Sequence, residues 1–480
     1  MNNKIDFFKA AGQKIFLFLI ALIFVSCDFF STGYEENTKN KKDDEEEIIV
    51  HNSAYYEKFL ELNTGLPLLV INTVNNEAIT SKEDYVNASF DLIEEGRSDV
   101  VFGEGLVSIK GRGNSSWSSW QNFPKKPYTV KLPEKTKLLG LPKHKKWVLV
   151  ANYSDYSLLR NTFASYAGKN VFTKMSWAPS MQNIDLILNG TYVGNYTLGE
   201  QIRINKKRVN IQSFLDTDLG EGEDLNKDGI VDINDGGFIL EIENRDTENS
   251  IYKSKNGNGC SFELKDPGED DFSSWTEKHY NYIKNIVDNA ENAVCSRKNW
   301  RNFIDVPSFI DWYLANEFFL NTDSLSWQTS AYMYYDPADK KLHMGPDWDF
   351  DIAMGNYSGV NTDPESWNSY THYGSNGYVT HWYDYLFQDT TFKNELIERW
   401  KEISDEMENS IEKIDEMAEK NKISAEKDLE KWPARKTETI WPNPSSFTSY
   451  ENEVSNLKNW LSKRRVWMDK NISSIGRSLH

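Results

Sequence analysis

Cysteine and positive charge are both scarce in this sequence. The 480 residues include 3 Cys, and 54 Lys and Arg stand against 73 Asp and Glu, which gives a formal net charge of −19. A chain this acidic should not bind nucleic acid or an anionic membrane non-specifically. Two of the cysteines, Cys260 and Cys295, could pair in an oxidising compartment, although nothing in the sequence requires it.

Long hydrophobic runs are also missing. The apolar run from Ile15 to Val25 is too short to span a bilayer, but after Lys4, Lys9 and Lys14 it is typical of a signal peptide. It leads into FVSC, a lipobox-like sequence, so we expect cleavage before Cys27 and lipidation of that residue. Ordinary signal cleavage nearby, or an uncleaved anchor, is the alternative.

The residues after the signal peptide predict a tether. We interpret residues 1–26 as a lipoprotein signal peptide and residues 27–60, with DDEEE at Asp43 to Glu47, as a disordered acidic segment. Removing residues 1–26 changes the formal charge from −19 to −21, because three Lys and one Asp leave with them. The mature protein would then lie in a bacterial cell envelope, facing the periplasm or the exterior, with a lipid as its membrane attachment.

No second hydrophobic segment, repeat or Pro/Ser-rich linker divides residues 61–480. Strand patterns such as GLVSIKGRG, PYTVKLP and GFILEIEN fill residues 61–265 approximately, with one helix expected from Arg160 to Val171. From about 266 to 480 the pattern is mainly helical. Strands first and helices second predict an α+β fold with two lobes, and a cleft between lobes is where a nucleotide would bind.

Four acidic residues flank one predicted hairpin. Asp323 follows an apolar helix predicted from Pro307 to Leu320, and strands are expected at Ser330 to Tyr335 and Lys341 to Met344. Three acids then occur within five residues: Asp347, Asp349 and Asp351. Because the ends of a hairpin lie close in space, we expect Asp323 and the later acids to meet in one cleft. Phosphoryl transfer needs that arrangement: one carboxylate orients the attacking hydroxyl and another holds the magnesium.

An amide five residues after the catalytic Asp helps to hold the second metal in protein kinases. Counted from Asp323 that position is Gln328, which offers the same carbonyl oxygen on a longer side chain. The chain contains neither HRD nor DFG. The simpler interpretation is that these acids are solvated hairpin ends, since Asp is common in turns.

Several ordered motifs resemble the CotH (spore coat protein H-type) kinases. They are WDFD (348–351), NTD (321–323), KGRGNSSW (110–117), KKPYTVKL (125–132), ANYSDYSLLRN (151–161), LNGTYVGNYTLGEQI (188–202) and GGFILEIE (236–243). The resemblance runs from about residue 64 to NWLSKRRVWM near the end. It implies an atypical secreted or surface kinase with a two-lobed, protein-kinase-like fold. Asp323 matches the catalytic Asp and Asp349 the metal-binding Asp, whereas Gln328 stands where Asn is expected.

Candidate nucleotide contacts are less distinctive. Lys131 alternates with Val130 and Leu132 in a strand, so it points to the opposite face and could reach phosphates, or it could simply face solvent. Arg112 lies between two glycines, which allow close backbone approach to an anion. Glu200 or Arg160 could be the partner that holds Lys131 in position. The alternative for both residues is an ordinary ion pair between packed elements.

A second strong motif is DLNKDGIVDIND. In a twelve-residue calcium loop, oxygens come from alternating positions, a backbone carbonyl serves at position 7, and Gly at position 6 makes the turn. The motif forms part of an insertion at 216–236 and resembles the dockerin version of the loop. We therefore predict a structural Ca²⁺ bound by Asp224, Asn226, Asp228, Ile230, Asp232 and Asp235.

These observations predict a surface-anchored kinase that transfers the γ-phosphoryl group of ATP to a protein or glycan hydroxyl, using Mg²⁺ or Mn²⁺. Asp323 would accept the proton; Asp349, assisted by Asp347 or Asp351 and by Gln328, would hold the metal; Lys131 and Arg112 would contact phosphate. The alternative is a non-catalytic surface protein that binds glycans or partners on a kinase-like scaffold. A glycosidase would need two acids flanking a sugar groove, for which we find no independent support.

Overall fold

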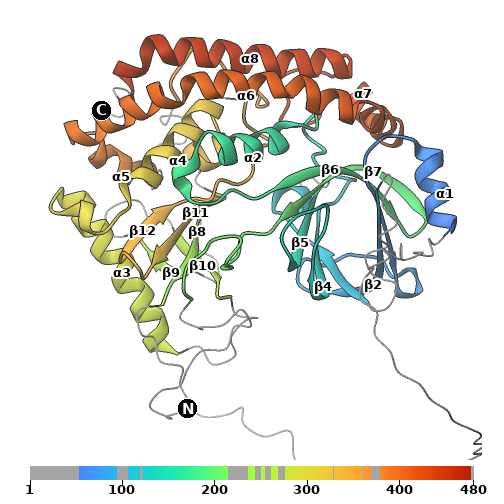
Figure 1. Ribbon diagram of the computed structural model, residues 1–480, viewed down its shortest axis with the longest axis horizontal. Coiled ribbons are helices and arrows are strands. Elements are labelled where there is room, and N and C mark those ends of the chain that lie inside the picture. Colours follow the sequence, from blue (N-terminus) through green and yellow to red (C-terminus); the bar gives the residue numbers. More distant parts are fainter. Residues whose placement is uncertain are drawn as a thin grey trace, which may run out of the picture. The chain divides into compact units, whose positions relative to one another are not determined.

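Seven strands from the first half of the chain close into a barrel. We describe residues 53–94, 106–118, 123–213, 236–243, 250–254, 261–268, 276–327, 329–359, 362–368 and 379–476 of a computed structural model (Figure 1). The strand order is β1-β2-β3-β4-β5-β7-β6, and a parallel pairing of β1 with β6 closes it. The strands are β1 (Leu68–Thr73), β2 (Val86–Ile93), β3 (Val107–Gly111), β4 (Tyr128–Thr136), β5 (His144–Val150), β6 (Met181–Leu188) and β7 (Thr191–Glu200).

Alternation along the strands decides which side chains fill the barrel. In β4, Val130 and Leu132 are buried while Lys131 between them is exposed, as period-two patterning requires. Trp147 of β5 and Phe90 of β2 are also buried in this core. The barrel therefore has a packed interior.

A second sheet of five strands has the order β12-β11-β8-β10-β9. It joins the predicted hairpin to strands that precede it by many residues, because β11 pairs antiparallel with β8. Its strands are β8 (Phe238–Glu243), β9 (Ser250–Lys253), β10 (Ser261–Asp266), β11 (Ala331–Asp336) and β12 (Lys341–Met344).

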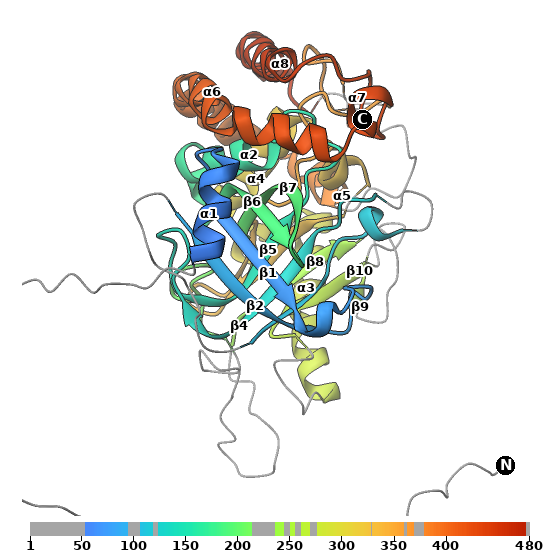
Figure 2. The same cartoon turned by 90° about the vertical axis from the view of Figure 1, so that its right-hand side faces the viewer.

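Helices form the rest of the described chain. The 42-residue α6 lies beside α8, and both run over α2 and α4 in Figures 1 and 2. The helices are α1 (Ser53–Leu62), α2 (Arg160–Asn170), α3 (Glu277–Ser296), α4 (Val306–Phe319), α5 (Val379–Leu386), α6 (Thr390–Lys431), α7 (Ala434–Thr437) and α8 (Tyr450–Asn471). In the part of the chain described above, no helix combines the length and apolar character needed to cross a membrane.

The local predictions around the acids are confirmed to within one residue at each end. The helix predicted from Pro307 is α4, which Asp305 caps by accepting a hydrogen bond from the Ser308 backbone N–H at 2.9 Å, with Pro307 in the first turn. Its residues are buried nearly all round, as expected of a helix without a polar face. The helix expected at Arg160 is α2. The disordered tether expected over residues 27–60 is wrong at its end, because Ser53–Leu62 forms α1, which packs aromatic side chains against β1.

The mixed α+β architecture, strand-rich first and helical later, is also confirmed. A closed barrel was not predicted: the resemblance implied a typical two-lobed kinase, whereas β1 to β7 close on themselves. A short apolar cluster joins the barrel to the second sheet, where Trp348 packs against Val148 of β5 and Tyr334 of β11. Trp348 therefore holds the segment with the three acids between the two sheets.

A histidine ties the start of α4 to the hairpin turn. His343 of β12 lies between two carboxylates, with Nδ1 3.5 Å from Asp305 Oδ2 and Nε2 3.1 Å from Asp339 Oδ2, and its ring stacks on Tyr334 at 4.8 Å. Burial lowers the pKa of His343, but the hydrogen bond and charge of Asp305 and the charge of Asp339 outweigh it, and the pKa is raised from 6.5.

A raised histidine pKa stabilises the fold at low pH. The contribution is complete below pH 6.5 and is lost as the pH rises through the folded-state pKa. Replacing His343 by Gln should therefore cost about 1 kcal/mol of unfolding free energy in acid, and less at alkaline pH. Denaturant unfolding across this range measures the difference, with Asp339→Asn as the matched variant. A penalty independent of pH in both variants would contradict the proposed ion pairs.

Candidate active site

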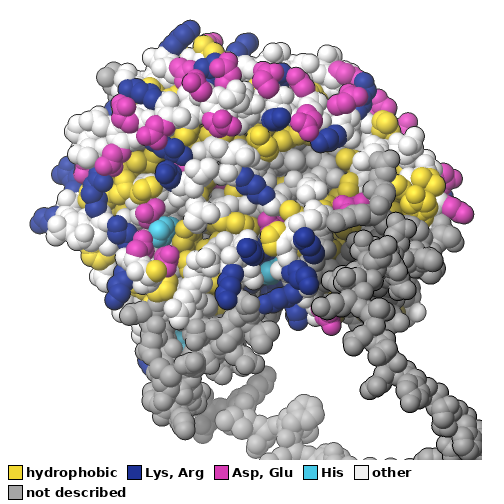
Figure 3. All heavy atoms as spheres, in the orientation of Figure 1, with side chains coloured by type: hydrophobic (Ala, Val, Ile, Leu, Met, Phe, Trp, Pro, Cys, Tyr) yellow, Lys and Arg dark blue, Asp and Glu magenta, His cyan; other side chains and the backbone are white. Residues whose placement is uncertain are grey.

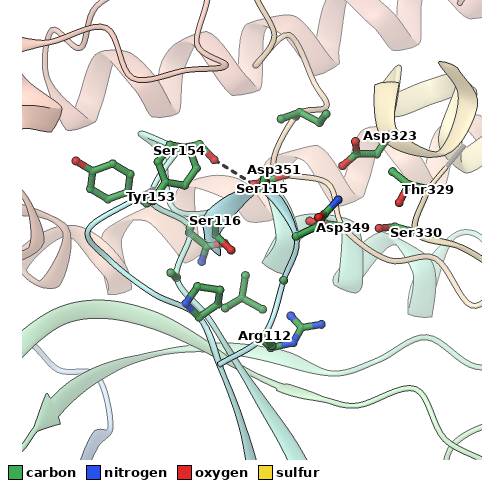
Figure 4. Close-up of a pocket in the computed structure, with 18 of the residues that line it drawn as sticks. Arg112, Ser115, Ser116, Tyr153, Ser154, Asp323, Thr329, Ser330, Asp349 and Asp351 are labelled. Atoms are coloured by element: carbon green, nitrogen blue, oxygen red, sulfur yellow. Dashed lines mark hydrogen bonds between the residues drawn. The ribbon is translucent and has the colours of Figure 1, made fainter. Parts of the chain in front are cut away.

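A pocket of about 720 Å³ lies where the barrel, the second sheet and the segment after β12 meet. The barrel contributes the loop from Arg112 to Ser116 and the segment from Val150 to Ser154. The second sheet contributes Glu243 at the end of β8. Figure 4 shows Asp323, Asp349 and Asp351 in the upper part of the pocket and Arg112 below them, with Ser115 close to Asp351 in this view.

Three acids from two separate segments converge there. One carboxylate oxygen from each of Asp323, Asp349 and Asp351 lies within 4.8 Å of the others. Asp323 begins a π-helical turn (Asp323–Trp327, labelled η6) that follows α4, a backbone form frequent at functional sites. Asp349 has φ +64°, in the left-handed region that Asp tolerates better than most residues. The hairpin between the segments brings the acids together, as its spacing predicted.

Hydrogen bonds from asparagines hold these segments in register. Asn321 Nδ2 donates to the backbone carbonyl of Asp349 at 3.2 Å, which joins the Asp323 turn directly to the later acids. Asn161 Oδ1 of α2 accepts from the Phe350 N–H at 2.8 Å, and Asn356 Nδ2 donates to the Asp351 carbonyl at 2.6 Å. Sequence reasoning missed these roles, although Asn161 and Asn321 lie inside the motifs that identified the site.

Burial and mutual repulsion raise the pKa values of the three carboxyls. Burial, then the charges of Asp349 and Asp351, raises the pKa of Asp323 well above its usual value. Burial and the Asp349 charge raise the pKa of Asp351 to about 8, opposed by the Ser154 hydroxyl, which donates to Asp351 Oδ2 at 3.0 Å. Burial also raises the pKa of Asp349, where the Arg112 charge opposes it. Ionising all three carboxyls without a bound cation is therefore unfavourable.

Glu243 adds a fourth acid at the edge of the cluster. Burial, followed by the charges of Glu241 and Glu263, raises its pKa to about 7, and it also contributes to the raised pKa of Asp323. Thr329 Oγ1 donates to both oxygens of Glu243 at 3.1 Å. Glu243 is the last residue of the GGFILEIE motif and was not predicted as a site residue; its position at a strand end is the signal from which it could have been found.

Asp347 lies apart from the other acids. Its Oδ1 accepts a hydrogen bond from Asn316 Nδ2 of α4 at 2.8 Å, and burial raises its pKa to about 8. The predicted assistance to Asp349 by Asp347 or Asp351 therefore falls to Asp351. Strict alternation would place all three acids on one face. Asp349 in the left-handed region interrupts the extended backbone, so Asp347 bonds to α4 while the next two acids line the pocket.

Arg112 lines the pocket, as the motif suggested, with its guanidinium 5.2 Å from the Trp348 ring. The flanking glycines serve local packing. A Cβ on Gly111 would lie 2.4 Å from Cζ2 of Trp117, and Gly113 has φ +93° with its Cβ position 2.6 Å from Ser116 Oγ. These glycines let the loop fold over Trp117 and bring Arg112 to the pocket.

The structure does not bring the other predicted nucleotide residues to this pocket. Lys131 is exposed on the outer face of β4, and Lys125 is the lysine that lines the pocket. Arg160 pairs with Asp155 and donates to the Ala353 carbonyl at 3.2 Å, and Glu200 lines a separate cavity near α2. Arg160 and Glu200 therefore form ion pairs between packed elements, which was the alternative interpretation of both residues.

Lys125 is buried and its ammonium is engaged with the helical region. Nζ lies 2.6 Å from Asp428 Oδ1 of α6, and it also donates to the Asn195 carbonyl of β7. Burial lowers the pKa of Lys125 to about 8 despite the opposing charge of Asp428. Asp428 also pairs with Arg435 of α7, so this network ties α6 and α7 to the barrel wall beside the pocket.

Other predicted sites lie outside the described residues. These are Gln328, the lipidation site Cys27 and the calcium loop formed by Asp224, Asn226, Asp228, Ile230, Asp232 and Asp235. Cys260, one half of the possible disulfide, also lies outside them. Each of these stays a prediction.

A pocket with converging carboxylates, a facing arginine and several hydroxyls defines a site suited to metal-assisted chemistry on a charged substrate. The family model described as CotH kinase protein matches residues 109–468, which is most of the chain. The chain belongs to the CotH kinase family. No curated protein matches it.

Proposed function

We propose that this protein is a surface-anchored atypical kinase that transfers the γ-phosphoryl group of ATP to a hydroxyl of a protein or glycan. The observation that carries the proposal is the convergence of Asp323, Asp349 and Asp351 from two segments on one pocket. Membership of a kinase family supports the reaction class. The expected signal peptide and lipidation of Cys27 support a location in the bacterial envelope.

The donor set fits a hard divalent cation. Carboxylate oxygens are what Mg²⁺ and Mn²⁺ prefer. Burial and mutual repulsion raise the pKa values of Asp323 and Asp351, and a bound cation would offset this penalty on their ionised forms. Asp349 and Asp351 would hold the cation, with Ser154 orienting Asp351 by its hydrogen bond. A cation bound there would neutralise charge on the transferred phosphoryl group.

Asp323 would then serve the acceptor. It lies on the far side of the acid pair, beside Thr329 and Ser330 in the close-up (Figure 4). From there its carboxylate orients the attacking hydroxyl and accepts its proton as the bond to phosphorus forms. The contribution is positional, because phosphoryl transfer needs little covalent participation from the protein.

The opposite wall would take the phosphates and the base. Arg112 supplies a positive charge. Ser115 and Ser116 lie on the same loop as Arg112 and supply hydroxyl donors. Phe123 and Tyr153, which pack with ring centroids 5.2 Å apart, give the pocket an aromatic wall that an adenine ring can contact. These placements are hypotheses about the same pocket.

The test is transfer of labelled phosphate from γ-labelled ATP by the purified chain, with Mg²⁺ or Mn²⁺, to itself or to envelope extracts. We expect transfer that stops when the metal is chelated, and a thermal shift with Mg-ATP. Absence of both, together with a shift caused by oligosaccharides, would favour the non-catalytic glycan binder instead. A comparison of phosphorylated products with those of an Asp323 variant would identify the acceptor.

A further inference from the structure

Basic side chains gather at the end of the barrel farthest from the pocket. Figure 3 shows Lys and Arg concentrated near the centre of one face of this acidic molecule. The pocket is lined by Val150 at the end of β5, whereas the lysines surround the start of that strand, roughly 20 Å away along an extended chain. We call this surface the basic patch. Lys169 and Lys207 line one cavity in it, Lys206 adjoins Lys207, and Lys143 and Lys145 follow the cavity residue Pro142.

Like charges here are closer than folding requires. Lys131 of β4 stands directly opposite Lys146 of β5 in the sheet register, an arrangement that is unfavourable in antiparallel strands. Burial, and then the positive charges of Arg208, Arg203 and Lys146, lower the pKa of His144 to about 3. Glu200 and Asp266 offset the charges of Arg208 and Arg203, so the positive charge that an anionic partner would meet comes mainly from the lysines.

A cavity of about 320 Å³ opens within the patch. Lys169 and Lys207 line it, together with the hydroxyl residue Ser180. One acid, Glu200, also lines it, but its charge is already balanced: Oε2 accepts from the Ser180 N–H at 2.9 Å and Oε1 lies 3.5 Å from Arg208 Nε. Lys169 Nζ donates to Ser180 Oγ and lies near enough to Glu200 for its charge to act on it. The cavity therefore offers a phosphate-sized anion the ammonium of Lys207 beside a lysine that Ser180 already holds.

We propose that the basic patch docks the protein on the anionic surface of a lipid bilayer, with the cavity receiving a phosphate headgroup. Its five members are all lysines, whose compact hydrated charge suits a diffuse anionic surface, whereas nucleic-acid recognition favours the fork of arginine. A bilayer at this end of the barrel leaves the pocket at the other end open. The lipid expected at Cys27 would supply the second of the two signals that stable membrane attachment needs.

The net charge of −19 does not oppose this docking. Electrostatic potential in physiological salt decays over about 8 Å, so a surface in contact with the patch experiences mainly the lysines nearest to it. Global charge limits non-specific attraction at long range, whereas local charge determines which face meets the membrane. The expectation that the chain avoids anionic membranes therefore applies to its other faces.

The test anchors the full chain on vesicles of phosphatidylcholine, alone or with phosphatidylglycerol, and measures acylation of each lysine by mass spectrometry. On anionic vesicles, labelling of Lys143, Lys145 and Lys207 should fall about fivefold, the factor expected for roughly 1 kcal/mol per lysine at such a surface. High salt should restore it. Exposed lysines far from the patch, Lys436, Lys463 and Lys470 of α7 and α8, should label equally on both vesicle types.

Charge reversal provides the matched control. The triple variant combines Lys143→Glu, Lys145→Glu and Lys207→Glu. Its patch should no longer contact anionic vesicles, so the remaining lysines, Lys169 and Lys206, should be labelled as strongly there as on neutral vesicles. The same reversal at the three control lysines should change nothing at the patch. Equal labelling of wild type on both vesicles would overturn the proposal. Protection of Lys143 and Lys145, which do not line the cavity, by inorganic phosphate alone would also overturn it by assigning the patch to free phosphate. Protection of the patch by DNA without vesicles would overturn it by assigning the patch to nucleic acid.

Discussion

Asp323→Asn should reduce phosphate transfer by about 10³-fold while leaving Mg-ATP binding nearly intact, because general-base catalysis is worth 10²–10⁴. The substitution keeps the shape of the side chain and removes the proton acceptor. Steady-state transfer of labelled phosphate measures the loss, and calorimetric titration with Mg-ATP measures binding. If kcat is unchanged, Asp323 is not the base and the acceptor must be activated elsewhere.

A loss of activity through misfolding can be separated from this effect. Burial and the neighbouring acids raise the pKa of Asp323, so its charged form is unfavourable in the folded state. A neutral Asn should therefore leave the metal-free protein at least as stable as wild type at pH 7. A clear drop in melting temperature would instead mean that Asp323 has a structural role that its hydrogen bonds do not reveal.

Asp349→Asn should remove metal binding, the second large effect. Even residues that only support a metal ligand change affinity by about 10–100-fold when altered, so loss of a direct carboxylate should exceed that range. We expect Mn²⁺ or Mg²⁺ to raise the melting temperature of wild type and to leave that of Asp349→Asn unchanged. Transfer of phosphate should fall with it.

Asp347→Asn is the matched control for this variant. Asp347 is buried two residues away, accepts its hydrogen bond from Asn316, and has a pKa that burial raises to about 8. A neutral amide there replaces a carboxyl that is largely protonated at pH 7, so metal-dependent stabilisation should persist. A metal response that survives in Asp349→Asn and disappears in Asp347→Asn would reverse our assignment of the two acids.

The convergence of the acids was predictable because local rules govern every step toward it. Helix capping at Asp305 and Pro307 fixes where α4 begins, and turn chemistry after β11 returns the chain toward the end of that helix. The distance along the chain from Asp323 to Asp349 then becomes a short distance in space. Gly345, whose N–H donates to the Tyr332 carbonyl at 2.8 Å, completes the return.

The lysine assignment shows where local rules end. Alternation correctly placed Lys131 and Val130 on opposite faces of β4. It does not say whether the outer face of that strand meets solvent or the cleft. Closure of the barrel decides that, and it leaves Lys131 outside. Lys125 is instead drawn inward by Asp428, a partner 303 residues later in the chain that no sequence periodicity connects to it.

By itself, the sequence determined the element types, the order of strands before helices, the hairpin and the family to which the chain belongs, since periodicity, caps, turns and motifs act over short stretches. Tertiary structure alone decided that the barrel closes, that Glu243 joins the cluster while Asp347 turns away, and that lysines from separate strands and loops form one patch. Those outcomes depend on packing between segments far apart in the chain, where burial and charge act through space and are not encoded in any single segment.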